Sequence, residues 1–147
     1  MSRLTSLTQL ALLLTLVGCT DPLISVPGGK LKGEPTAAPA SWSSVPDVIQ
    51  LETRPDDPYS VNIWALVESG NLYLATENAR WLAHIRADDR VRVRIEGMLY
   101  ALRAEKVTEV EEMNRLAAAY KKKYDYEIDT TSFASANAFR LVARQEQ

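Results

Sequence analysis

Hydrophobic and polar residues alternate most regularly in RVRVRIE, residues 90–96. Three aliphatic side chains fall on one side and three arginines on the other, which is the period of a β-strand with one buried face. Gly97 then turns the chain, and MLYALRAEKV, residues 98–107, returns as the partner strand. The pattern predicts an antiparallel hairpin in the middle of the chain.

Four further segments have the composition of strands. They are residues 48–53, 61–67, 72–76 and 138–144. Residues 61–67 are apolar on both faces, which predicts burial on both sides. A turn signal at residues 68–71 separates them from 72–76, so these two strands are expected to pair antiparallel. In the last segment, Phe139 and Leu141 share one face.

Two segments have the period of amphipathic helices. In residues 77–89, Trp81, Leu82 and Ile85 fall on one face, and Asn78 is the expected N-cap. The second helix is predicted to begin at a capping box formed by Thr108 and Glu111. Its expected inner face consists of Val110, Met113, Ala117, Tyr120 and Tyr124. Lys121, Lys122 and Lys123 lie near its C-terminus, where the helix dipole favours cations.

The order of these elements predicts an α+β fold that is mainly β. About six antiparallel strands form hairpins, with two helices inserted between them. Such an arrangement favours a small barrel or a strongly curled sheet whose ends the helices cover.

The first 18 residues have the proportions of a secretory signal peptide. Arg3 precedes an apolar stretch from about Leu7 to Val17, which is too short to span a bilayer. The sequence LVGC, residues 16–19, resembles a bacterial lipobox, which implies cleavage before Cys19 and acylation of its sulfur. Two or more acyl chains anchor a protein stably, so membrane lipid is the expected partner of Cys19.

The alternative is an ordinary signal peptide with an incidental cysteine. By resemblance to lipoprotein sorting rules, Thr20 favours the periplasmic face of the outer membrane. Residues 19–46 are rich in Pro, Gly, Ala and Ser and are predicted to be a flexible tether. Residues 47–147 then form one small domain.

Composition excludes several kinds of chemistry. The formal net charge is −2, and −3 without Arg3, so no basic excess predicts a nucleic-acid partner. Cys19 is consumed by lipidation and His84 is the only histidine, so no Cys–His pair or multi-histidine metal site is expected. No G-x-S-x-G motif is present. The chemistry that remains is that of a bound cofactor.

Several short motifs together carry a family resemblance. They are a Thr-Arg strand end at 53–54, Ile-Trp at 63–64, LYLAT at 72–76, a helix with Trp81, and a D-x-V-x-V strand from Asp89. The chain from about Val48 to Arg144 resembles the split β-barrel proteins related to pyridoxamine-phosphate oxidases and deazaflavin-dependent reductases. Residues 117–125 and 139–144 look more specifically like an uncharacterised branch of that superfamily.

The resemblance implies a homodimer with FMN or a deazaflavin in a groove between the subunits. The matching cofactor-binding positions are Arg54, Thr76, Asn78, Arg80 and Trp81, with Trp64 and Trp81 able to stack on the ring. Deazaflavin reductases carry a Gly-Arg-x-Ser-Gly phosphate loop where this chain has Arg-Pro-Asp-Asp, residues 54–57. Two carboxylates there would repel a phosphate.

Each of these residues also has a simpler interpretation. Arg54 and Arg80 are typical of solvated surface, His84 of a structural role, and the two tryptophans of core packing. The arginines of residues 90–94 would fit a solvated edge strand, lipid headgroups or a cofactor phosphate. Two functions stay open: a lipid-anchored flavin-dependent reductase, and a lipoprotein that uses the barrel as a binding or scaffolding module without a cofactor.

Overall fold

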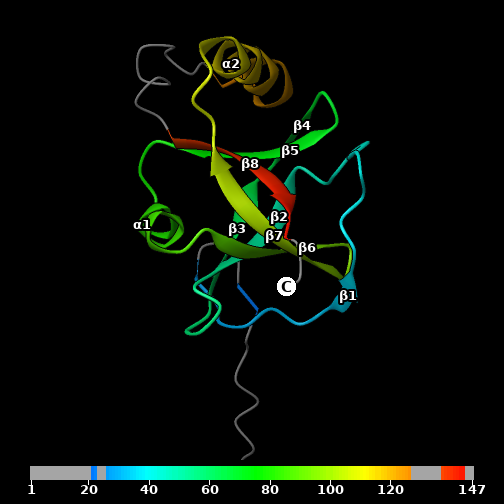
Figure 1. Cartoon of the computed structure of the whole chain (residues 1–147), viewed down its shortest axis with the longest axis vertical. Coiled ribbons are helices and arrows are strands. Elements are labelled where there is room, and N and C mark those ends of the chain that lie inside the picture. Colours follow the sequence, from blue (N-terminus) through cyan, green and yellow to red (C-terminus); the bar gives the residue numbers. More distant parts are fainter. Residues whose placement is uncertain (1–20, 23–25, 127–136, 145–147) are drawn as a thin grey trace, which may run out of the picture.

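The computed structural model describes residues 21–22, 26–126 and 137–144, which form eight strands and two helices (Figure 1). In chain order these are β1 (Glu34–Thr36), β2 (Val48–Thr53), β3 (Tyr59–Trp64), β4 (Leu66–Glu68), β5 (Asn71–Thr76), α1 (Arg80–Ala87), β6 (Arg90–Ile95), β7 (Met98–Lys106), α2 (Val110–Tyr124) and β8 (Asn137–Ala143).

The sheet curls until its two ends meet. Its strand order is β3-β2-β6-β7-β8-β5-β4, with every neighbouring pair antiparallel, and β1 joins β7 in parallel. The terminal strands β3 and β4 are consecutive in the chain and are separated by Ala65 alone. The prediction of a mainly β, curled antiparallel sheet with two inserted helices is therefore confirmed.

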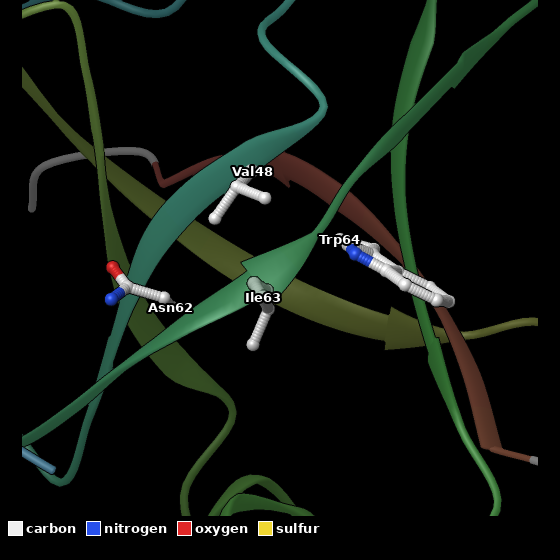
Figure 2. Close-up of a pocket in the computed structure, with 4 residues that line it drawn as sticks. All are labelled: Val48, Asn62, Ile63 and Trp64. Atoms are coloured by element: carbon white, nitrogen blue, oxygen red, sulfur yellow. The ribbon is translucent and has the colours of Figure 1, made fainter. Parts of the chain in front are cut away.

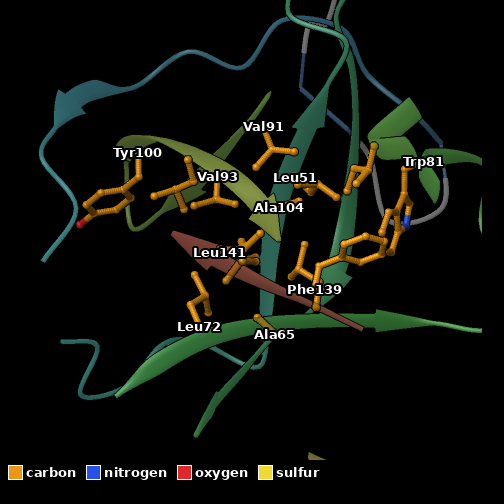
Figure 3. Packing of buried hydrophobic residues seen from close by; sticks show 14 of the residues in the cluster. Leu51, Ala65, Leu72, Trp81, Val91, Val93, Tyr100, Ala104, Phe139 and Leu141 are labelled. Atoms are coloured by element: carbon orange, nitrogen blue, oxygen red, sulfur yellow. The ribbon is translucent and has the colours of Figure 1, made fainter. Parts of the chain in front are cut away.

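The inward faces of the strands form the main core (Figure 3). Val91, Val93 and Ile95 of β6 are buried, as their alternation predicts. Phe139 and Leu141 of β8 are buried in the same cluster. Helix α1 covers one end of the barrel through its predicted apolar face, Trp81, Leu82 and Ile85.

The predicted strand 61–67 is divided in two at Ala65. Both backbone groups of this residue leave the ladder, because its amide donates to the Asp47 carbonyl at 3.2 Å and its carbonyl accepts from Lys123 and Tyr124 of α2 at 2.8 and 2.7 Å. As a result β3 pairs with β2, and only β4 pairs with β5. The predicted pairing of the whole segment with residues 72–76 is wrong for its first half.

Strand β6 lies inside the sheet, between β2 and β7, so the edge-strand interpretation of its arginines is wrong. Arg92 forms an ion pair with the buried carboxylate of Glu52 on β2. Arg94 reaches Asp21 at 3.1 Å and the Lys32 carbonyl at 2.9 Å. The arginine stripe is therefore occupied by contacts within the chain.

Both helices begin differently from the prediction. Ala79, not Asn78, is the N-cap of α1, and Glu109 is the N-cap of α2; neither start has a side-chain capping bond. Val110 is 71% exposed, while the buried face of α2 includes Glu112. The Glu112 carboxylate accepts from the Tyr73 hydroxyl at 2.6 Å. This face of α2 therefore contacts β5 through a polar group as well as through apolar ones.

Part of the segment predicted as a tether packs against the barrel. Leu31 is 1% exposed and its amide donates to the Glu52 carboxylate at 2.6 Å, and β1 pairs with β7. Backbone hydrogen bonds and irregularly spaced apolar contacts, such as those of Trp42 and Val45 with the core, hold this segment, so its sequence shows no hydrophobic period. Within the described residues, no helix has the length and apolar character needed to cross a membrane.

Candidate cofactor site

Five of the six residues predicted to bind a cofactor lie on α1 or on segments next to it. Thr76 ends β5, Asn78 lies in the connection that follows, and Arg80 and Trp81 open the helix. Arg54 follows β2, whose last residue, Thr53, contacts His84 of α1. The region around His84 and the start of α1 is called the α1 corner below.

Arg54 is held in an unusual conformation at this corner. Its backbone has a φ of 54°, in the left-handed region, and its carbonyl accepts from the Asp57 amide at 2.9 Å. Its guanidinium lies 5.9 Å from the ring centroid of Tyr59 and forms an ion pair of 3.1 Å with Asp57. The Nε atom is buried and has no hydrogen-bond partner among the described residues. Arg54 thus brings positive charge to the corner in a fixed position.

The charges of both predicted arginines, Arg54 and Arg80, act on His84. Its Nδ1 lies 2.9 Å from the Thr53 hydroxyl, and its ring packs edge-on against Tyr59 with centroids 4.9 Å apart. Burial lowers the pKa of His84 below its usual value, and the nearby charges of Arg54 and Arg80 lower it further. The imidazole is therefore neutral at pH 7, and the corner carries its positive charge on the arginines.

The start of α1 is open to an anion. No side chain caps it, its first turn contains no acidic residue, and Arg80 occupies the first helical position. The Leu82 amide is satisfied by the Ala79 carbonyl at 3.0 Å. Among the described residues, Arg80 makes no hydrogen bond or ion pair, so its charge adds to the positive end of the helix dipole.

The two aspartates expected to repel a phosphate are both paired with arginines. Asp57 contacts Arg54, and Asp56 contacts Arg90 at 3.1 Å. Both carboxylates are more than 80% exposed, so solvent screens their charge as well. Their effect on an anion at the start of α1 is smaller than the sequence suggests.

Thr76 and Trp81 have structural contacts that limit their roles. Trp81 is 6% exposed and packs edge-on against Phe139, with ring centroids 6.3 Å apart, as the core-packing interpretation predicts. Thr76 pairs with Asn137 of β8, whose side-chain oxygen accepts from Arg86 at 3.0 Å. The indole of Trp81 is therefore not exposed for stacking on a cofactor ring.

Trp64 does not belong to the α1 corner. It ends β3, five residues after Tyr59, which corresponds to about 17 Å along the strand. It lines a separate open cavity of about 480 Å³ together with Val48, Asn62 and Ile63 (Figure 2). No arginine or lysine lines this cavity in the part of the chain that the structure describes. The six predicted residues are therefore divided between two regions.

Sequence reasoning missed the part that Thr53 and Tyr59 play in the α1 corner. Tyr59 follows the Pro-Asp-Asp-Pro turn, a signal for a loop end, and only the pairing of β2 with β3 brings it beside Thr53. No group of three or more metal-ligating side chains is found within residues 21–22, 26–126 and 137–144.

No family model and no curated protein matches this sequence. Solved structures do match it. A putative pyridoxamine 5'-phosphate oxidase from Listeria innocua is 17% identical, with a TM-score of 0.54, over 67% of this chain and 85% of that one. The fold is a split β-barrel. A conserved hypothetical protein from Mycobacterium tuberculosis shares this split barrel at 23% identity, with a TM-score of 0.53, over 70% of this chain and 75% of that one.

A third similar structure is described as a FAD-binding protein from Mesorhizobium loti. It is 20% identical, with a TM-score of 0.50, over 67% of this chain and 82% of that one. Identities at this level establish the shared split barrel and not a shared activity.

Proposed function

We propose that this chain is a lipoprotein anchored through acylated Cys19, whose split barrel binds FMN or a deazaflavin as a homodimer and reduces a small molecule. The observation that carries the cofactor proposal is the uncapped start of α1, whose first residue, Arg80, makes no hydrogen bond or ion pair with the described residues. The likeness in fold to a protein described as FAD-binding supports the same class of ligand.

The α1 corner fits the phosphate of such a cofactor. Open amides at a helix start and a guanidinium are the groups that hold phosphates in proteins. Arg54 adds a second positive charge, and the neutral His84 keeps its Nδ1 on the Thr53 hydroxyl. Asn78 is exposed just before the helix, where its amide can donate to a phosphate oxygen.

The chain's own residues would bind and orient the cofactor and leave the reaction to it. A bound flavin or deazaflavin supplies hydride transfer. Arg80 and the α1 start would fix the phosphate end. Because Trp81 is in the core and Trp64 is distant, neither of these two tryptophans would stack on a ring held at the corner.

A second candidate function is a cofactor-free binding lipoprotein. The ion pairs Arg54–Asp57 and Arg90–Asp56 favour it, since both neutralise charge that an anion would otherwise use. The compartment favours it too, because a secreted domain must find its cofactor after export.

The test is thermal unfolding of the full chain in detergent, with and without FMN or deazaflavin. Binding raises the melting temperature by mass action. Since a hydrogen bond to a charged group contributes about 1.5–3 kcal/mol, Arg80→Gln should need roughly ten-fold more FMN for the same shift. Arg115→Gln, an exposed arginine on α2, is the matched control. A colourless protein that responds to neither cofactor would favour the second candidate.

Anchoring is tested separately with radiolabelled palmitate in growing bacteria. The label should appear on the wild-type chain and be absent from Cys19→Ser. A chain that retains its leader and takes up no label would contradict the lipoprotein proposal.

A further inference from the structure

The outer face of β3, β2 and β6 is organised in rows that run across the strands. Gln50 of β2 lies between Asn62 of β3 and Arg94 of β6, and these three residues form the middle row. Two residues further along each strand, Val48 pairs with Trp64 and forms the last row. Successive rows on one face are about 7 Å apart.

The N-terminal segment, described at residues 21–22 and 26–31, makes contacts along the rows before the last one. Gly28 bridges to Ser60, and the Leu31 amide binds Glu52 in the row before the middle one. In the middle row, Asp21 pairs with Arg94 at 3.1 Å, and the Pro22 carbonyl accepts from Asn62 at 3.4 Å. Asp21 and Pro22 therefore lie at the middle row, one row away from Val48 and Trp64.

The last row is exposed and apolar. Val48 and Trp64 are 50% and 51% exposed, and both line the 480 Å³ cavity (Figure 2). The ring of Trp64 stacks on Tyr124 of α2 at 4.8 Å, and Tyr126 lies edge-on at 6.4 Å. Val48, Trp64, Tyr124 and Tyr126 are called the aromatic row below. A contiguous exposed patch of this kind is typical of an interaction surface.

Chain length limits how far the anchor can lie from the sheet. Cys19 precedes Asp21 by two residues, so their Cα atoms are at most about 8 Å apart. Asp21 is held to Arg94 in the row next to the aromatic row. A lipid on Cys19 would therefore enter its bilayer on the outer face of the sheet, the face that also carries Val48 and Trp64.

We propose that the aromatic row lies on the bilayer that holds the acylated Cys19. This inference rests on the lipid anchoring proposed above. Tryptophan and tyrosine suit the zone between headgroups and acyl chains because they combine an apolar ring with a polar group. The barrel would thus rest directly on the membrane in a defined orientation, with the α1 corner at the other end of the β2–β3 hairpin and open to solvent.

The charged residues around the aromatic row limit how deeply it can enter the bilayer. Lys123 binds the Ala65 carbonyl at 2.8 Å and pairs with Asp47 at 3.3 Å, and Lys121 pairs with Asp125 at 3.2 Å. Charged groups are costly in the hydrocarbon core, so this rim belongs among hydrated headgroups. The rings of Trp64 and Tyr126 would then reach the upper part of the acyl chains.

The experiment uses the purified lipidated chain in vesicles of phosphatidylcholine and phosphatidylglycerol, with and without bromine on the acyl chains. Bromine quenches tryptophan emission at short range, so wild-type emission should fall in the brominated vesicles. Trp64→Phe should lose most of this quenching, since Trp81 is in the core and Trp42 packs on Tyr100. Val110→Ser, which changes an exposed apolar residue outside the aromatic row, should keep it.

Vesicle flotation separates failure of anchoring from failure of orientation. A chain that floats with the vesicles but is quenched equally with and without Trp64 would overturn the inference and leave anchoring intact. So would a dimer that buries Trp64 and shows no bromine effect. A chain that does not float would overturn the anchoring, and the inference with it.

Discussion

The two ends of the β2–β3 hairpin differ in nearly every physical property. The end at Thr53 and Tyr59 meets α1 and gathers arginines, paired carboxylates and a neutral histidine. The end at Val48 and Trp64 meets α2 and exposes apolar and aromatic side chains. A hairpin of this length keeps the arginine-rich α1 corner and the apolar surface about 17 Å apart.

The largest expected effect is a difference in stability between variants of Trp81 and Trp64, the two tryptophans predicted to bind one cofactor. Trp81→Ala should lower the free energy of unfolding by about 3–5 kcal/mol, because it leaves a cavity in the core. Trp64→Ala should cost about 1 kcal/mol, because half of that side chain is already exposed and its main contact is one stacked ring. Urea unfolding of both variants measures the difference. Equal losses would mean that the two ends are not distinct in packing.

The next effect concerns Glu52, which lies between the two ends and is 1% exposed. Glu52→Ala removes the partner of Arg92 and of the Leu31 amide, and breaking a buried ion pair costs about 3 kcal/mol. The N-terminal segment should also become more open to limited proteolysis around Leu31. Glu34→Ala, on the exposed face of β1, is the control and should change neither measurement.

The smallest effect is a pH dependence confined to the α1 corner. The folded-state pKa of His84 is lowered, so the unfolded chain binds the proton more readily. Stability from this group is complete above about pH 6.5 and falls as the pH drops below that value. His84→Gln should flatten this part of the stability–pH curve, measured by urea unfolding between about pH 5 and 8. An unchanged slope would show that folding does not lower the pKa of His84.

The sequence pattern correctly predicted the features that depend on neighbouring residues in the chain. The alternation in β6 gave its inward face, and the spacing of Trp81, Leu82 and Ile85 gave the buried face of α1. The breaks in the pattern come from distant partners. The residues around Ala65 do not indicate that Lys123 and Tyr124 bind its carbonyl. Those around Arg92 do not indicate its ion pair with Glu52 on another strand.

The candidate site was predictable only in part for the same reason. Thr76, Asn78 and Arg80 are close in sequence, so their gathering at the start of α1 follows from the order of elements. The separation of Trp64 depends on strand direction beyond Ala65, and the role of Thr53 depends on how α1 packs against β2. Such contacts are set by tertiary packing, which a single sequence does not display.

The break between β3 and β4 at Ala65 also bears on the order of folding. Lys123 and Tyr124, whose side chains donate to the Ala65 carbonyl, come 58 and 59 residues later in the chain. Because the chain is made from its N-terminus, β3 and β4 emerge well before Lys123 and Tyr124. Contacts between residues so far apart in sequence form slowly. The sheet cannot close until α2 has emerged and β8 has followed it, because β8 joins β7 to β5.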